Sequence, residues 1–157
     1  MLSLAATILA GVIPGKNGNI AIIPSMDKYQ KVGVCAYIQR GDGKFLVVHR
    51  SSKDDFQPGL YDLPGGEVEF GETPVEALLR EVMEETKLKV KILTPTFVYS
   101  NVQKEIRHQF WIIYKCEYLG GEICLDRNDH DEYKWVSIEE ARKLATIIFL
   151  SALLYKL

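Results

Sequence analysis

The chain has 157 residues and a formal net charge of -2, with 47% hydrophobic and 25% charged residues. This length fits one domain with a buried core, and the composition is ordinary for a globular protein. The slight negative charge argues against a broad face for binding a nucleic-acid duplex, because such faces are basic. A small phosphorylated ligand, held by a few local cations or metal ions, is still compatible with it.

The N-terminal feature is an apolar run from Leu2 to Ile13. It is too short to span a bilayer as a helix, and it lacks the positively charged start of a signal peptide, so we expect no membrane association. An added strand or hairpin, a contact in a homodimer and a start-site extension are the open interpretations. A turn over 15–19 leads into the apolar run Ile20 to Ile23. We assign residues 1–28 to an N-terminal extension and residues 29–157 to the main domain.

The three cysteines are Cys35, Cys116 and Cys124. Their odd number and wide spacing suggest neither a disulfide framework nor a zinc knuckle. A reducing compartment is the simplest setting for such thiols, and we therefore expect a cytoplasmic protein.

Two strands joined by a tight turn are predicted next. Lys31 to Gln39 is rich in β-branched and aromatic residues, and Arg40 to Gly43 contains an Asp-Gly pair, the strongest hairpin signal in the chain. Lys44 to Arg50 is the partner strand, and its continuous apolar core predicts that both of its faces are covered. A polar loop follows over Ser51 to Leu60, and a short strand is predicted from Tyr61 to Leu63.

A tight turn at Gly65 and Gly66 precedes the most strongly predicted helix. Thr73 is a candidate N-cap, Pro74 suits the first helical position, and Glu76 completes a capping box. Apolar residues recur at helical spacing and predict the face that packs on the sheet. These residues are Val75, Leu78, Leu79, Val82 and Met83.

The remaining chain predicts three strands and two helices. Lys89 to Ser100 and Ile106 to Tyr118 predict long strands around a polar turn, and Glu132 to Val136 predicts a short one. A second capping box begins at Ser137 and opens a helix, and Thr146 to Leu157 predicts the last helix. This mixture indicates an α/β fold with helices on both faces of a mixed sheet.

Three carboxylates share one face of the helix that begins at Pro74. Glu81, Glu84 and Glu85 stand at i, i+3 and i+4, so they are neighbours. They repel one another and oppose the helix dipole at its C-terminal end. A hard divalent cation removes both penalties, and all-oxygen ligation favours Mg2+ or Mn2+ over zinc. For the helix taken alone, the alternative is a solvated acidic face with an Arg80–Glu84 pair.

The whole segment resembles the Nudix box. That family pattern has a glycine, a glutamate six residues on, an Arg-Glu-aliphatic-any-Glu-Glu group after seven more residues, then any residue, a glycine and an aliphatic residue. The matching residues are Gly66, Glu72, Arg80, Glu81, Val82, Glu84, Glu85 and Leu88. Lys87 departs from the pattern, because it stands where the family has a glycine, near a helix end where left-handed backbone is common.

The resemblance implies a Nudix α/β/α sandwich and the hydrolysis of a nucleoside diphosphate linked to another group. The expected substrate is a small phosphorylated nucleotide, most simply a nucleoside triphosphate or a modified nucleotide, as for a MutT-like pyrophosphohydrolase. Dinucleoside polyphosphates, ADP-ribose and nucleotide sugars are alternatives, because specificity lies in loops outside the box. A non-catalytic module that senses a nucleotide is the alternative from another class.

The resemblance also implies roles for single residues. Glu81, Glu84 and Glu85, with the carbonyl of Gly66, would bind Mg2+ or Mn2+ and help to activate water. Arg80 would orient the carboxylates of the box. Divalent ions neutralise pyrophosphate oxygens and lower the pKa of bound water, and a carboxylate then accepts its proton. Glu81 or a glutamate outside the box is the expected base.

Further candidates lie outside the box. Asp129 and Glu132 are acidic residues for substrate binding and catalysis respectively, with a solvated loop as the alternative. Arg50 is a candidate phosphate ligand, with a surface salt bridge as the alternative. Tyr61 and Phe56 are candidates for contact with a nucleobase, with core packing as the alternative.

The strand from Ile106 is expected to approach the pocket. It carries Arg107 and also His108, for which we favour a structural role. We expect the aromatic residues Phe110, Trp111 and Trp135 to belong to the core, with a platform for base stacking as the alternative.

Overall fold

The main sheet is built around β3 (Tyr29–Gln39) in the computed structural model, which describes residues 11–14, 20–23, 28–53 and 57–157. β3 pairs in parallel with β8 (Arg107–Gly120), and its last residue pairs across the hairpin turn with the first residue of β4 (Phe45–Arg50). It also pairs antiparallel with β6 (Gly65–Glu67). Parallel and antiparallel pairs therefore coexist, which confirms the predicted mixed sheet.

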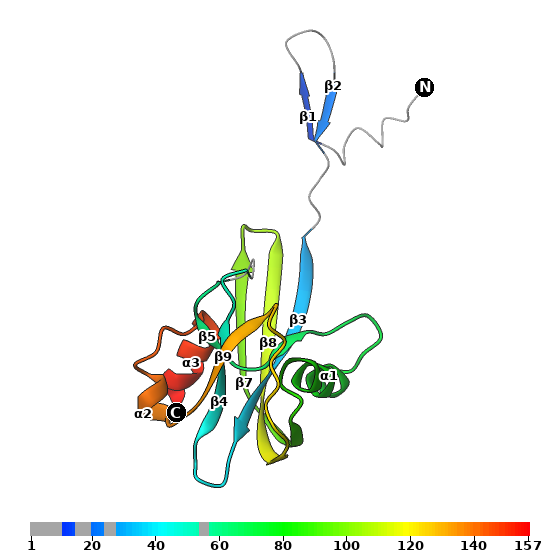
Figure 1. The fold of residues 1–157 in the computed structure, drawn as a ribbon. Helices are drawn as coiled ribbons and strands as arrows, with labels where there is room; N and C mark the ends of the chain where they lie inside the picture. Colours follow the sequence, from blue (N-terminus) through cyan, green and yellow to red (C-terminus); the bar gives the residue numbers. More distant parts are fainter. Residues whose placement is uncertain (1–10, 15–19, 24–27, 54–56) are drawn as a thin grey trace.

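The sheet is extended on both sides of these strands (Figure 1). β7 (Lys89–Gln103) pairs antiparallel with β8, while β5 (Tyr61–Asp62) and β9 (His130–Val136) both pair with β4. The strands predicted on either side of the Asp-Gly turn are confirmed. Of the strands predicted around the polar turn, β7 runs three residues further into the turn than expected, and β8 begins one residue later and ends two residues later.

The glycine pair predicted as a tight turn lies instead in β6. Gly65 and Gly66 pair with Cys35 and Val34 of β3. The backbone of Gly65 has φ 153°, and a Cβ there would fall 2.1 Å from the carbonyl oxygen of Val34. The turn prediction was wrong because the absence of a side chain serves close strand contact here rather than a reversal of the chain.

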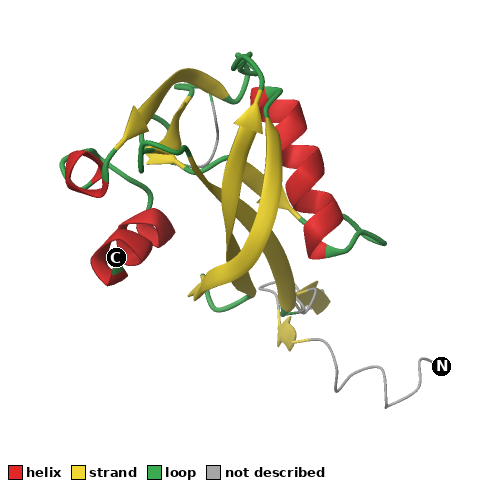
Figure 2. Cartoon of the chain, turned by 90° about the horizontal axis from the view of Figure 1, so that it is seen from below, coloured by secondary structure: helices red, strands yellow, loops and turns green. Residues whose placement is uncertain are grey.

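Helices cover both faces of the sheet. Figure 2 shows α1 (Pro74–Thr86) on one side, with α2 (Ile138–Ala141) and α3 (Ile148–Lys156) on the other. This arrangement confirms the predicted α/β/α sandwich. None of the helices in the described ranges combines the length and the apolar composition needed to cross a membrane.

The core follows the two-residue alternation of the strands. Val34, Ala36 and Ile38 of β3 belong to the cluster packed under α1, whereas Cys35 and Tyr37 belong to the cluster that includes α3. The apolar residues of β4 divide between the same two clusters and are fully buried, so both faces of that strand are covered as predicted.

The capping of α1 is as predicted, but its packed face is not. Thr73 and Glu76 form the reciprocal capping box, and Pro74 opens the helix. Leu78 and Val82 are buried. The other residues of the predicted stripe are 43 to 45% exposed, namely Val75, Leu79 and Met83. The buried positions instead include Ala77, Glu85 and Thr86. The helix is therefore turned about its axis toward the side that carries Glu81 and Glu85.

Near the N-terminus, β1 (Gly11–Pro14) and β2 (Ile20–Ile23) pair antiparallel in a sheet of their own. This pairing agrees with the added-hairpin interpretation of the apolar run. The predicted turn over 15–19, most of the run from Leu2, and the candidate Phe56 lie outside the described residues.

Candidate active site

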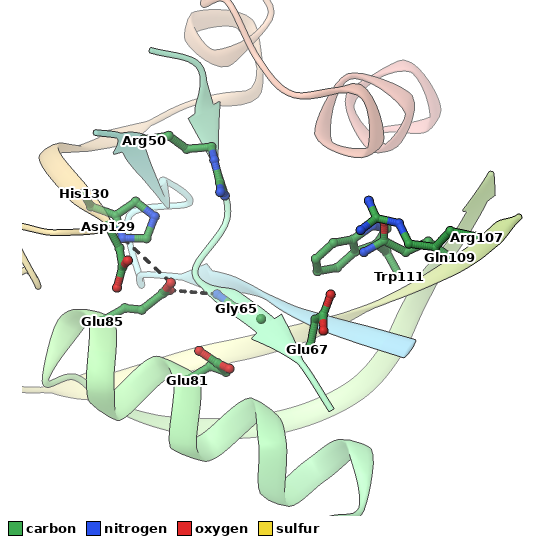
Figure 3. Close-up of a pocket in the computed structure, with 11 residues that line it drawn as sticks. Arg50, Gly65, Glu67, Glu81, Glu85, Arg107, Gln109, Trp111, Asp129 and His130 are labelled. Carbon is green, nitrogen blue, oxygen red and sulfur yellow. Dashed lines mark hydrogen bonds and ion pairs between the residues drawn. The ribbon is translucent and has the colours of Figure 1, made fainter. Parts of the chain in front are cut away.

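A cavity of about 310 Å³ opens beside β6, between the C-terminal half of α1 and the start of β8 (Figure 3). Carboxylates from α1 and from the segment before β9 lie on one side of it, and two arginines and a tryptophan also face it. The lining residues are Arg50, Gly65, Gly66, Glu67, Glu81, Glu85, Arg107, Gln109, Trp111, Asp129 and His130. The cavity therefore offers groups for a cation and groups for an anion within one space.

Glu81 and Glu85 reach the cavity because they stand one helical turn apart on α1. Gly66 lies directly against the first of them, since a Cβ on Gly66 would come within 2.3 Å of Glu81 Oε1. Burial raises the pKa of the Glu81 carboxyl, although the neighbouring Arg80 opposes the shift. This glycine is therefore required for the packing of a carboxylate as well as for strand pairing.

Glu85 is the most enclosed carboxylate of the site. The backbone N–H of Gly65 donates to Glu85 Oε2 at 2.9 Å, and His130 Nδ1 lies 3.8 Å from Oε1. Burial raises the pKa of Glu85 well above its usual value, and the carboxylates of Glu81, Asp62 and Asp129 raise it further. Such mutual repulsion is the electrostatic condition that a bound cation relieves.

Arg80 donates hydrogen bonds to several acidic residues of the box. Its Nε donates to Glu72 Oε1 at 2.7 Å and its Nη2 to Glu72 Oε2 at 3.0 Å. Its Nη1 donates to Glu81 Oε1 at 2.8 Å and to Glu84 Oε2 at 3.1 Å. These carboxylates raise the pKa of Arg80 above its already high value. Arg80 thus contacts three carboxylates of the box, as expected of a residue that orients them.

The predicted metal ligands are only partly assembled. Glu81, Glu85 and Gly66 line the cavity, whereas Glu84 is turned toward Arg80, with 59% of its side chain exposed. Within the described ranges, no three His, Cys, Asp or Glu side chains already stand in a metal-binding arrangement. The chemistry of the donors nevertheless fits a hard cation, because the acidic groups that line the cavity offer oxygen ligands.

Of the predicted substrate residues, Arg50 and Asp129 line the cavity. Arg50 Nη1 donates to Asp62 Oδ2 at 2.9 Å, and both side chains are largely buried. Burial beside a carboxylate fixes the direction of this guanidinium at the end of β4.

Tyr61 and Glu132 do not line the cavity, contrary to their predicted roles in it. Tyr61 is 8% exposed, and its hydroxyl donates to Glu132 Oε2 at 2.8 Å. Lys134 pairs with the same carboxylate at 3.1 Å. The reason is register, since Tyr61 of β5 and Glu132 of β9 stand opposite His49 from the two sides of β4. They brace this strand together rather than face α1.

Several lining residues were not predicted from the sequence. Trp111 lines the cavity and also stacks on Phe149, at 4.8 Å between ring centroids, so it is more than the core residue we expected. Gln109 lines it too. Arg107 belongs to the strand that was expected to approach the pocket and does line the cavity, whereas His108 does not. The available signal was Gly33, because a glycine inside a strand marks a close approach.

Lys87 adopts the left-handed conformation that the family glycine position predicts. Its φ is 60°, and its N–H donates to Met83 O at 3.2 Å as the helix C-cap. Its Nζ donates to Glu84 O at 3.2 Å. The lysine therefore preserves the geometry of the helix end and adds a favourable charge there.

Comparisons with known proteins agree with this geometry. The NUDIX domain family model matches residues 29–154. The chain is 33% identical over 150 residues to an ADP-ribose pyrophosphatase of Methanocaldococcus jannaschii, covering 90% of this chain and 86% of that one. It is 34% identical over 121 residues to the nucleoside triphosphatase NudI of Salmonella agona, covering 71% and 84%. The crystal structure of a MutT protein from Methanosarcina mazei superposes with a TM-score of 0.73 at 27% identity, covering 84% and 94%.

Proposed function

This chain belongs to the Nudix family and is a hydrolase of the pyrophosphohydrolase kind, and from that premise we propose that it hydrolyses a nucleoside triphosphate or a modified nucleotide with Mg2+. One observation carries the proposal. Glu81 and Glu85 open on the same cavity as Arg50 and Arg107. A polyphosphate needs cations on its oxygens and an acceptor for the proton of the attacking water. The arginines of the cavity can supply the first, and its carboxylates can supply the second.

Proteins of this family generally use a divalent metal ion, and we assign its ligands to Glu81, Glu85 and the carbonyl of Gly66. When bound, Mg2+ would neutralise phosphate oxygens and lower the pKa of a bound water. Glu84 is the third carboxylate of the box and pairs with Arg80 outside the cavity. To bind the metal as well, its side chain would have to turn toward the cavity. Mn2+ prefers the same oxygen donors and is the alternative ion.

The remaining roles follow from position. Glu81 is our candidate base, since burial raises the pKa of its carboxyl toward the range in which a general base works best. Arg80 is a positioning residue that holds Glu81 and Glu72. Arg50 is our candidate for holding a phosphate and Asp129 our candidate for contacting the substrate, because both line the cavity. Glu132 receives no role in this proposal, because it braces β4 outside the cavity.

ADP-ribose is the second candidate substrate. The relative named ADP-ribose pyrophosphatase matches more of this chain than the nucleoside triphosphatase does. Both substrates present a pyrophosphate to the same carboxylates. The box residues therefore do not discriminate between the two substrates, and the reaction products have to do so.

The test is a substrate panel with Mg2+ in which every product is identified. A nucleoside triphosphate should yield the monophosphate and pyrophosphate, or the diphosphate and phosphate, whereas ADP-ribose should yield AMP and ribose 5-phosphate. Omission of the metal should abolish each reaction. Binding without hydrolysis across nucleoside triphosphates, dinucleoside polyphosphates, ADP-ribose and nucleotide sugars would support a nucleotide-sensing module instead.

Matched variants test the assigned residues. Glu81→Gln and Glu85→Gln should each lower kcat about 100-fold or more, since each removes a charge at the reacting centre. Glu117→Gln, at an exposed position of β8, is the control and should leave kcat unchanged. Normal turnover in both site variants would refute the assignment.

We also propose that residues 29–157 suffice for catalysis and that residues 1–28 are an extension, because the family model begins at residue 29. Removal of residues 1–27 should leave kcat within about twofold. A loss of activity or a changed oligomeric state would place the segment in the core or at a homodimer contact.

We also propose a reducing, cytoplasmic setting, which the free thiols of Cys35, Cys116 and Cys124 support.

A further inference from the structure

The start of β8 presents a second group of side chains to the cavity, away from the α1 carboxylates (Figure 3). Arg107, Gln109 and Trp111 alternate along the strand, so they share one face, and all three line the cavity. The three residues of β8 include no acid, although Glu67 of β6 lines the cavity beside them. Gln109 and Trp111, which carry no charge, are therefore suited to the part of a substrate that lies beyond the phosphates.

Gln109 brings an unsatisfied polar atom to this face. The residue is 3% exposed, and its Oε1 is buried with no hydrogen-bond partner among the described residues. A buried carbonyl oxygen without a donor costs about as much free energy as a lost hydrogen bond, so native proteins keep few of them. Such an acceptor beside a cavity indicates a ligand that donates.

A second acceptor stands next to the first. Asn101 of β7 is the register partner of Gln109, and directly opposed residues of an antiparallel pair place their side chains on the same face. Asn101 Oδ1 is also buried without a hydrogen-bond partner within the described ranges. Gln109 lines the cavity, whereas Asn101 lies next to it in the sheet and outside the lining. No donor among the described residues satisfies either oxygen.

The third component is a fixed aromatic surface. The Trp111 ring lies over the backbone of its register partner Gly33, where an added Cβ would come within 2.4 Å of Trp111 Cζ3. Phe149 of α3 stacks on the ring, with 29° between the ring planes, and fixes its position further. A ring held in this way is an apolar wall against which a flat heterocycle can pack.

We propose that Gln109 and Asn101 are specificity-determining residues that accept hydrogen bonds from adjacent N–H groups of a nucleobase packed against Trp111. Two neighbouring acceptors match a base edge with two neighbouring donors, and among the common bases guanine has this pattern in its N1–H and its 2-amino group. The inference rests on the proposed action on nucleotides and specifies which nucleotide is preferred.

The test measures binding separately from hydrolysis. Isothermal titration of the full-length chain with GMP, IMP and AMP should give the tightest binding for GMP, by about 10-fold over IMP, which lacks the 2-amino group. Gln109→Leu and Asn101→Leu should each reduce that preference by about 10-fold. Gln30→Leu, at an exposed glutamine of β3, should keep it.

Thermal unfolding separates a ligand contact from a structural role. Because Gln109→Leu removes an unsatisfied buried acceptor, its Tm should equal or exceed that of the wild type. A fall in Tm, or an equal loss of affinity for all three monophosphates, would overturn the proposal. Triphosphate hydrolysis that is indifferent to the base would also overturn it, whereas GMP selection without any triphosphate hydrolysis would support it and refute only the proposed function.

Discussion

Gly66 and Glu81 occupy a space that only a residue without a side chain can share with a carboxylate. A Cβ at Gly66 would stand 2.3 Å from Glu81 Oε1 and 2.4 Å from its Cδ. The first residue of the family pattern and the first glutamate of its acidic group are therefore coupled by packing. This contact gives a physical reason for a glycine fifteen positions before the carboxylate it accommodates.

Gly66→Ala should displace the Glu81 carboxylate and lower kcat about 10- to 100-fold, the range typical for residues that orient a metal ligand. Steady-state kinetics with saturating Mg2+ would measure the effect. Gly41→Ala is the matched control, because a Cβ there meets nothing within 4 Å. Equal kcat values for both variants would contradict the packing argument.

Arg80→Lys should lower kcat about 10-fold or more while changing KM little. A lysine keeps the charge but loses the planar fork that binds Glu72 with two nitrogens and Glu81 with a third. Arg40→Lys, which alters an exposed arginine–aspartate pair at the hairpin turn, controls for the exchange itself. A rise in KM alone would indicate that Arg80 touches substrate instead.

The stability of the metal-free protein should depend on pH through Glu85. Burial raises its pKa in the folded state above the unfolded value. Its stabilising contribution is therefore complete below the ordinary glutamate pKa of about 4.3 and is lost as pH rises through the folded-state value. In urea with a chelator, Glu85→Gln should be more stable than the wild type at neutral pH, and the difference should vanish in acid.

Two measurements check this account of Glu85. Glu122→Gln, at an exposed position, should show no such pH-dependent difference. Mg2+ should raise the Tm of the wild type more than that of Glu85→Gln, because a ligand stabilises only the state that binds it. A stability difference that is constant with pH would exclude a raised pKa as its cause.

Lys87→Gly should stabilise the protein by about 0.5–1 kcal/mol. A left-handed conformation costs an ordinary residue roughly 1–2 kcal/mol, while glycine gives back about 0.5–1 kcal/mol through the entropy of the unfolded chain. Lys87→Ala removes the Nζ contact with Glu84 O but keeps the backbone conformation. The free energy of unfolding from chemical denaturation should therefore be highest for Lys87→Gly, and that of the wild type should equal or exceed that of Lys87→Ala. Activity should be preserved in all three proteins.

Local patterns predicted the parts of this structure that local physics controls. The capping box at Thr73, the Asp-Gly hairpin and the conformation at Lys87 all depend on residues within a few positions of one another. The acidic box was recognised by its resemblance to the Nudix box, since the helical spacing of its glutamates alone is also typical of a solvated acidic face. These features needed no knowledge of distant neighbours.

The errors concern contacts between distant segments. The β6 pairing of Gly65 depends on the backbone of β3, and the place of Tyr61 and Glu132 depends on the register of β4. The exposure of Leu79 follows from the rotation of α1 about its axis. The sequence around Gln109 and Trp111 is typical of an ordinary strand. Their place in the cavity depends on their register partners Asn101 and Gly33, which belong to other strands.

The parallel pairing of β3 with β8 also has a kinetic consequence. β3 ends at Gln39 and β8 begins at Arg107, so the strands can meet only after the intervening hairpin, loop, helix and β7 have been synthesised. Contacts between such distant segments slow folding, because the entropy of closing a long loop is lost before the pairing compensates for it. α1 can form early, but the substrate cavity beside it is complete only after β8 has paired with β3.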